Sequence, residues 1–407
     1  MTDWRSVVAD PVFRAAVDAP VRVLSSRAEL VDLHGVPVPV QVGKRAATWH
    51  LPVSSASVTF RGETAQQWSA DVTFTDPWLV ITGPEHPLYP AQSLRVRLWW
   101  RIRVPYDPEP LYPSDDLYPS DDLYLSSGSR AWRWLEVPVM TGYPQDPSSV
   151  DGGTVTTSMQ VVDPLATARG GYGGEPLNLG GLNVAVALRA IFERCAPDLP
   201  LRIAETAITL PDTYELDGSD PAKDWTRIAD AAGWVVRTDR EGVVTCGPRP
   251  TPTAGFDWAE GAGCSVSQMR RDLRTSLMGN RQTVRSTHPD HVGVWATVQD
   301  DDPSSPTWVG GPFGVRPLPD IESDAITTED AALNLARMHL GRGLHPTEDV
   351  SVTIPQRADL DYQSPVHLAR AQLGVGGSYR VSSWSMSLPV AGEAPAPGRD
   401  IDHDDTR

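Results

Sequence analysis

The sequence has 407 residues and a net charge of −17, from 35 lysines and arginines against 52 aspartates and glutamates. This length predicts two or three domains of about 150 residues each, and the 38 prolines and 33 glycines predict a loop-rich, β-rich globular protein rather than a coiled coil or collagen. Because tight binding to duplex DNA requires a basic face, the excess of carboxylates argues against that function.

Residues 1–19 mix apolar and polar positions around Pro11 and predict a short N-terminal arm or helix. Residues 20–165 then alternate apolar and polar side chains, which predicts a first β domain. Its strongest strand covers 94–104, with apolar residues on one face and arginines on the other, and its antiparallel partner covers 131–139. Further short strands are predicted at 21–24, 36–42, 57–60, 68–76 and 153–162.

A tandem hexapeptide lies between the two long strands, in a predicted hairpin insertion at 105–130. The sequence Leu-Tyr-Pro-Ser-Asp-Asp occurs at 111–116 and again at 117–122. Two copies are too few for a solenoid, and the composition predicts an acidic, tyrosine-bearing loop that faces solvent or a neighbouring protein. The candidate partner-contact residues are Leu111, Tyr112, Asp115, Asp116, Leu117, Tyr118, Asp121, Asp122 and Tyr124.

Residues 166–264 predict an α+β middle domain. A glycine cluster at 170–174 is interpreted as a link, and a helix is predicted over 182–195. A second helix begins after Asp220, which is a good N-cap followed by Pro221, and ends at Gly233. A hairpin with strands at 234–238 and 243–246 follows.

Residues 265–391 predict a second β region with one helix, which begins near Thr327 and ends at Gly341 or Gly343. The predicted strands cover 282–285, 292–298, 350–354, 366–369 and 379–388. Residues 392–407 are rich in Pro, Ala and Gly and then acidic, which predicts a disordered tail. The predicted fold class is therefore mainly β with an α+β middle.

No group of residues has the spacing of a catalytic, cofactor or metal site. The three cysteines form no CxxC pair, and the histidines at 288 and 291 flank a proline and lack a third ligand. Aspartates 300–302 lack the alternate spacing of a calcium loop, and the glycine cluster lacks a nucleotide-binding fingerprint. We expect no catalytic residues, no cofactor, no metal and no enzyme activity, although composition alone leaves a carboxylate pair for glycoside cleavage possible.

The remaining features are interpreted as structural or as contacts with partners. Trp68, Trp100, Trp225 and Trp384 fall on the apolar side of their patterns and are predicted to lie in cores. No apolar run approaches the roughly 18 residues of a membrane span, and the N-terminus lacks a secretory signal. Five arginines form a local cluster that predicts either a solvated edge or a contact with an acidic partner: Arg270, Arg271, Arg274, Arg281 and Arg285.

The order of these features resembles the tail-hub (baseplate-hub-like) minor tail proteins of long-tailed bacteriophages, particularly those of actinobacterial hosts. The resemblance spans about residues 20–390 and lies in the order of weak motifs, whereas the tandem insertion is not part of the family pattern. The motifs that carry it are VTFTDP at 72–77, PLYP at 87–90, LEVPVMTG at 135–142, VVDPL at 161–165, DWTRIADAAGW at 224–234, DDPSSP at 301–306, ITTEDAA at 326–332 and GSYRV at 377–381.

The resemblance implies a structural protein at the distal end of the virion tail. Two tube-like β-barrel domains, at 20–165 and 265–391, would flank the α/β region, so that a homotrimer imitates a sixfold ring. Its channel would pass the tape-measure protein and the DNA, and its neighbours would be the distal tail protein ring and a tip or fibre protein. Strand 94–104 is then expected to pair by its edge with a neighbouring subunit.

Two other functions remain open at this stage. Fourteen tryptophans and the tyrosine-bearing loop also suit a receptor- or carbohydrate-binding protein of the tail tip. A peptidoglycan-degrading tail enzyme is the second alternative, although no motif of the sequence supports it.

Overall fold

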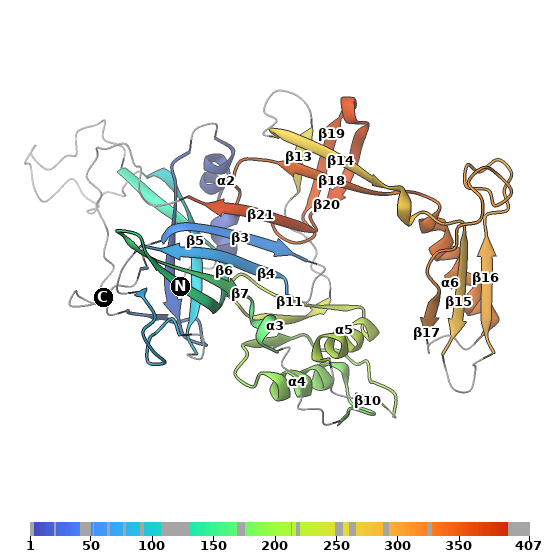
Figure 1. Ribbon diagram of the computed structural model, residues 1–407, viewed down its shortest axis with the longest axis horizontal. Coiled ribbons are helices and arrows are strands. Elements are labelled where there is room, and N and C mark those ends of the chain that lie inside the picture. Colours follow the sequence, from blue (N-terminus) through green and yellow to red (C-terminus); the bar gives the residue numbers. More distant parts are fainter. Residues whose placement is uncertain are drawn as a thin grey trace, which may run out of the picture. The chain divides into compact units, whose positions relative to one another are not determined.

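The computed structural model (Figure 1) is mainly β, as the sequence predicted, and its chain divides into two compact units. The first comprises Met1–Phe256, Gln356–Val366 and Tyr379–Arg407, and the second Asp257–Pro355 and His367–Ser378. The candidate partner-contact residues, the glycine cluster and the acidic tail lie outside the described residues. These are 4–19, 22–40, 50–51, 53–62, 66–75, 79–89, 93–106, 131–168, 176–212, 214–216, 220–248, 255–259, 266–287, 293–323 and 328–389.

An eight-stranded sheet, in the order β2-β1-β5-β6-β7-β4-β3-β21, forms the centre of the first unit. All of the pairs are antiparallel, and hairpins join several strands that follow each other in the chain. The bounds are β1 Leu24–Val31, β2 Pro37–Val38, β3 Val53–Arg61, β4 Trp68–Phe74, β5 Arg95–Tyr106, β6 Ala131–Asp151, β7 Val155–Val162 and β21 Ser383–Leu388.

The two ends of this sheet approach each other without pairing as a ladder. The backbone N–H of Leu51, two residues before β3, donates to the carbonyl of Ala28 on β1 over 2.8 Å. The Ser26 hydroxyl, also on β1, donates to the carbonyl of Pro389 just after β21. The sheet therefore curls toward a barrel, but neither it nor any other sheet among the described residues closes into one.

One apolar core fills the concave side of the sheet. Trp100, Phe74 and Val58 are fully buried there, on the faces that the period-two alternation assigned to the core. The N-terminal helices α1 (Trp4–Ala9) and α2 (Pro11–Asp18) belong to the same core, because Phe13 packs edge-on against Trp100 with ring centroids 6.0 Å apart. The predicted N-terminal arm is therefore a packed part of the domain, and the Asp10 side chain caps α2.

The interior position of β5 corrects the expected edge pairing of strand 94–104. β1 pairs with Arg95–Ile102 on one side of β5 and β6 pairs with Val96–Tyr106 on the other, so most of its backbone has no free edge for a neighbouring subunit. The alternation itself is confirmed, since Leu98, Trp100 and Ile102 face the core. On the other face Arg95 is only 1% exposed, so part of the predicted arginine face is covered by protein and not exposed to solvent.

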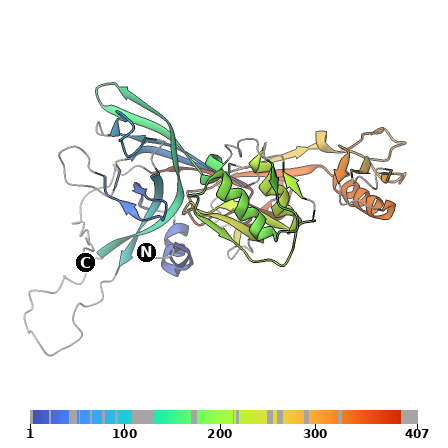
Figure 2. The same ribbon diagram turned by 90° about the horizontal axis from the view of Figure 1, so that it is seen from below.

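The α+β middle region belongs to the first unit. Its two longer helices pack side by side against a three-stranded sheet (Figures 1 and 2), with Phe192 stacked on Trp225 at 5.1 Å between ring centroids. The Asp220 side chain caps the second helix as predicted. The elements are α3 Pro164–Thr167, β8 Leu177–Asn178, α4 Val184–Cys195, β9 Leu201–Ile203, β10 Glu215–Leu216, α5 Pro221–Ala231, β11 Trp234–Thr238 and β12 Val244–Pro248.

The second unit consists of small open sheets and one helix, α6 (Glu329–Gly343). α6 covers one face of the sheet β16-β15-β17, where Val284, Ala332 and Ala336 are buried. The other strand pair is β14 with β18, and the chain passes between the two units within the sheet β13-β19-β20. The bounds are β13 Phe256–Ala259, β14 Gln268–Arg274, β15 Arg281–Ser286, β16 Trp295–Gln299, β17 Ile321–Ser323, β18 Thr347–Thr353, β19 Pro365–Arg370 and β20 Val375–Arg380.

The last predicted strand, 379–388, divides between two sheets. Its first residues end β20, whereas β21 pairs with β3 of the eight-stranded sheet from Ser383 opposite Arg61 to Leu388 opposite Ala56. The sequence had assigned this strand to the second β region at 265–391. The chain thus returns to its first domain at the end, and the second unit is an insertion before that return.

Candidate functional site

The hairpin β11–β12 is joined to the eight-stranded sheet by a buried polar junction. Gln67 stands just before β4, and its side-chain amide donates to the Val236 carbonyl over 3.0 Å and accepts from the Thr238 N–H over 3.1 Å. The Gln67 side chain therefore makes the two hydrogen bonds that the backbone of a neighbouring strand would make to β11. The indole N–H of Trp68 donates to the Thr238 carbonyl over 2.9 Å, so two consecutive side chains hold one strand end.

Asp163 fixes the position of these two residues. Its buried carboxylate accepts from the backbone N–H groups of Gln67 and Trp68 over 2.6 and 2.8 Å, and from that of Ala166 over 3.0 Å. The same side chain is therefore the N-cap of α3 and the anchor of the start of β4. A carboxylate at a helix N-terminus is favoured by the helix dipole, which adds to the three hydrogen bonds.

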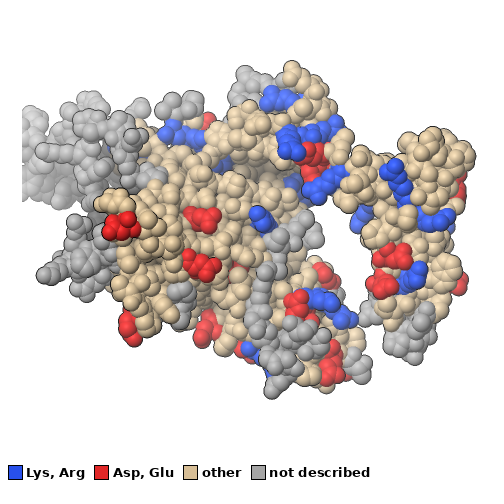
Figure 3. All heavy atoms as spheres, viewed as in Figure 1, with Lys and Arg blue, Asp and Glu red and all other residues tan. Residues whose placement is uncertain are grey.

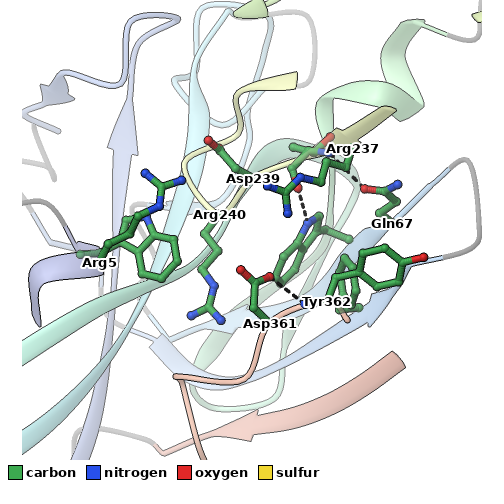
Figure 4. Close-up of a pocket in the computed structure, with 11 residues that line it drawn as sticks. Arg5, Gln67, Arg237, Asp239, Arg240, Asp361 and Tyr362 are labelled. Atoms are coloured by element: carbon green, nitrogen blue, oxygen red, sulfur yellow. Dashed lines mark hydrogen bonds between the residues drawn. The ribbon is translucent and has the colours of Figure 1, made fainter. Parts of the chain in front are cut away.

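Arg240 binds the returning segment at 356–366 to the same junction. Its guanidinium is fully buried, donates to the carbonyls of Ala358 and Leu360, and lies 4.8 Å from the centre of the Trp4 ring. Figure 4 shows the side chain extending between Arg5 and Asp361. Burial lowers the pKa of Arg240 and the Asp361 carboxylate opposes that change, but an arginine remains charged at neutral pH.

The turn that carries Arg240 is held from the sheet side. Arg95 donates to the Gly242 carbonyl over 3.0 Å, and the Thr141 hydroxyl donates to the Arg240 carbonyl over 2.9 Å. The Asp239 carboxylate accepts hydrogen bonds from the N–H groups of Glu241 and Val243. Burial raises the pKa of Asp239, and these two hydrogen bonds oppose the rise. The sequence predicted this turn, but not that the buried arginine of the central strand would bind it.

Gly242 has a φ of +75°, and an added Cβ would lie 2.8 Å from an Arg95 nitrogen and 3.0 Å from the Thr141 carbonyl oxygen. We expect Gly242→Ala to lower the free energy of unfolding by about 2 kcal/mol, from backbone strain and the displaced Arg95. Gly233, with φ +65° and nothing near its Cβ position, is the matched control, and Gly233→Ala should cost about half as much. Urea unfolding measures both; equal losses would show that the close approach is unimportant.

The cavity at this junction is too small for a substrate. Its volume is about 20 Å³, and its lining includes Gln67, Trp68, Arg240 and Tyr362 (Figure 4). That volume accommodates about one water molecule. The lining residues Gln67, Trp68 and Arg240 hold separate segments of the chain together, so the geometry is that of a structural joint.

A larger, open hollow of about 350 Å³ lies between β6 and the end of α4. Tyr143, Cys195 and Asp198 line it, together with prolines and backbone. Burial raises the pKa of Tyr143, and Cys195 is the last residue of α4. The surroundings of the Tyr143 hydroxyl therefore favour its neutral form.

The other sequence candidates show structural roles where they are described. Asp300 accepts from the hydroxyls of Ser305 and Thr307 in a turn, and no three His, Cys, Asp or Glu side chains among the described residues are grouped to hold a metal. Residues 288–292, with both histidines, lie outside the described ranges. In the parts of the chain that the structure describes, no helix is long and apolar enough to cross a membrane.

The arginine cluster of the second unit is neutralised by its own neighbours. Ion pairs join Arg271 to Glu348 at 3.0 Å and Arg274 to Asp349 at 2.6 Å across β14 and β18. Arg270 and Arg285 also pair with aspartates, and Arg281 donates to Gln299. Figure 3 shows basic and acidic side chains lying among one another over this unit, so the cluster is a solvated edge rather than a basic patch.

Comparison with solved structures identifies the fold of this chain. No protein-family model matches the sequence, and no curated protein matches it. Among solved structures, a tail protein from Neisseria meningitidis MC58 superposes with a TM-score of 0.55 at 13% identity, over 90% of this chain and 93% of that one. The 43 kDa tail protein of prophage MuSo2 from Shewanella oneidensis gives 0.53 at 14% identity, over 90% and 95%. This chain has the fold of these tail proteins.

A third structure agrees with the first two. The prophage tail protein gp18 from Listeria monocytogenes EGD-e superposes with a TM-score of 0.51 at 11% identity, over 88% of this chain and 90% of that one. The likeness extends over about nine-tenths of this chain in each case, so it includes residues of both units. The resemblance to tail proteins that the sequence indicated is confirmed as a likeness of fold.

Sequence reasoning missed the residues of the junction. Gln67, Asp163 and Arg240 lie far apart in the chain, and no spacing rule connects them. The available signal was the Asp-Pro pair at 163–164, because aspartate before proline is a common way to begin a helix. That signal predicts a cap, but it does not reveal that the same carboxylate binds the start of β4.

Proposed function

We propose that this protein is a structural component of a phage tail, a trimeric hub at its distal end, without catalytic activity. Three copies would surround a channel for the tape-measure protein and DNA, and would join the distal tail ring to a tip or fibre protein. The near-absence of lysine, with only Lys44 and Lys223 among 35 basic residues, is compatible with a GC-rich, actinobacterial host.

The observation that carries this proposal is the likeness to three solved tail proteins over about nine-tenths of the chain. Two further features support it. The buried polar groups of the junction serve to hold segments together, around a cavity of only about 20 Å³. The net charge of −17 suits a channel wall that must not bind passing DNA.

The copy number in the virion tests the proposal. Quantitative mass spectrometry of purified phage particles should find three copies of this 44.2 kDa chain per tail, and electron microscopy of tagged particles should place them at the distal end. The tape-measure protein serves as the internal standard. Six copies per tail, or a position along the tube, would contradict the hub, and a monomeric chain that binds host glycans would favour the receptor-binding alternative.

A further inference from the structure

β16 is an outer strand of the sheet β16-β15-β17, and its side away from β15 pairs with no strand among the described residues (Figure 1). The Ser286 N–H donates to the Val294 carbonyl over 2.9 Å, so the even-numbered residues of this segment are those that bond to β15. Bonded and non-bonded residues alternate in an antiparallel pair. The backbone N–H and C=O groups that point away from the sheet are therefore those of Trp295, Thr297 and Gln299. We call this row of groups the free edge of β16.

The free edge lacks the features that protect exposed strands from pairing. β16 contains no charged residue and no proline, whereas the outer strand β14 carries four charged residues, at 270, 271, 272 and 274. Trp295 is 62% exposed, which is unusual for so large an apolar side chain, and Thr297 is exposed as well. An uncharged strand of high β propensity with unpaired backbone groups is a template for a further strand.

The side chains of β16 indicate what kind of strand would fit. Ala296 and Val298 lie on the face that α6 covers and are only half-buried, so an added strand would extend this apolar layer with apolar side chains of its own. On the other face the Gln299 amide donates to the Asp301 carboxylate over 2.8 Å. Asp301 and Asp302 are both exposed just after the strand, so this end of the free edge is complementary to a lysine or arginine.

We propose that the free edge of β16 binds an extended segment of a different tail protein, which adds a strand to the sheet. The segment alternates apolar with polar residues and places a basic side chain beside Asp301, so that main-chain hydrogen bonds supply affinity and alternate side chains supply specificity.

The choice of a different protein over a second copy rests on the proposed trimer. Pairing of β16 with the same strand of a second copy is isologous and closes a dimer, which a threefold ring does not accommodate. The opposite edge of the sheet, β17, has only three residues and carries Glu322, which would bring a further carboxylate to the acidic end of β16.

Amide hydrogen exchange of the wild-type chain, resolved to single residues by mass spectrometry, tests the contact without a substitution. In the isolated chain we expect the amides of Thr297 and Gln299 to exchange about a hundredfold faster than those of Ala296 and Val298, which bond to β15. In purified phage tails all four should exchange slowly. Fast exchange at Thr297 and Gln299 in tails would overturn the inference. Slow exchange in the isolated chain would also overturn it, and light scattering then shows whether a second copy covers the edge.

Substitutions at the edge provide the second test. Thr297→Pro removes an outward N–H and leaves the bonds to β15 in place, because proline is tolerated on the open side of an outer strand. It should lower the amount of this chain in purified tails about tenfold, whereas Thr297→Val keeps the N–H and should leave that amount unchanged. Urea unfolding of the isolated variants shows whether both are folded. Equal incorporation of two folded variants would contradict the proposal.

The acidic end of the edge is tested separately, with a variant that does not alter the strand. Asp301→Lys should also lower incorporation into tails, and Glu205→Lys makes the same charge change at an exposed position of the first unit and should have no effect. Equal effects of the two would remove the basic residue from the proposal. If the wild-type chain is present at three copies per tail while the free edge stays unprotected, the proposed function survives; a chain absent from tails would overturn both.

Discussion

Replacing Arg240 with methionine is expected to lower the free energy of unfolding of the first unit by about 3 kcal/mol. The substitution keeps an unbranched apolar stem but removes the guanidinium, which leaves the carbonyls of Ala358 and Leu360 without their buried donor. Each lost hydrogen bond from a charged donor costs about 1.5–3 kcal/mol, partly offset because a buried charge no longer has to be desolvated. Urea unfolding monitored by near-ultraviolet circular dichroism measures the loss.

Arg237 provides the matched control for this prediction. It lies three residues earlier on β11, is only half-buried, and makes no hydrogen bond through its guanidinium that the structure shows among the described residues. Arg237→Met should change stability by no more than about 0.5 kcal/mol. Equal effects of the two substitutions would mean that Arg240 contributes no more than an ordinary half-exposed cation, and that the segment at 356–366 is held by its apolar contacts.

The strands of this protein were largely predictable because their period-two alternation is a local property. It located β4, β5, β7, β11 and β12 within a few residues. The strand predicted at 131–139 ends where prolines interrupt the alternation, whereas β6 in the structure continues to Asp151. The structure accommodates these prolines with irregular pairing, including a register shift between Gln145 and Ser148 and a φ of +47° at Asp146.

What covers each strand face was not predictable, because alternation separates two faces without identifying their environments. The apolar face of β5 lies in the core as expected, but Arg95 and Arg97 on the other face are also buried. Arg95 reaches the carbonyls of Asp32 and Leu33 as well as that of Gly242, contacts that depend on loops distant in the chain. The same limit applies to β21, whose pairing with β3 depends on the path of the whole chain.

Asp163→Ala is expected to cost about 3–4 kcal/mol, the largest effect of a single side chain at the junction. It removes the acceptor of three backbone N–H groups, those of Gln67, Trp68 and Ala166, at a side chain that is fully buried. Because Gln67 and Trp68 in turn hold the end of β11, the loss should also speed amide hydrogen exchange along that strand.

Asp220 is the control that distinguishes this role from ordinary helix capping. It also precedes a proline and caps a helix, but from an exposed position. Asp220→Ala should cost about 1 kcal/mol and leave exchange in β11 unchanged. If both variants lost the same stability, Asp163 would be no more than a helix cap, and the joint between the sheet and the middle layer would depend on Arg240 and the apolar core instead.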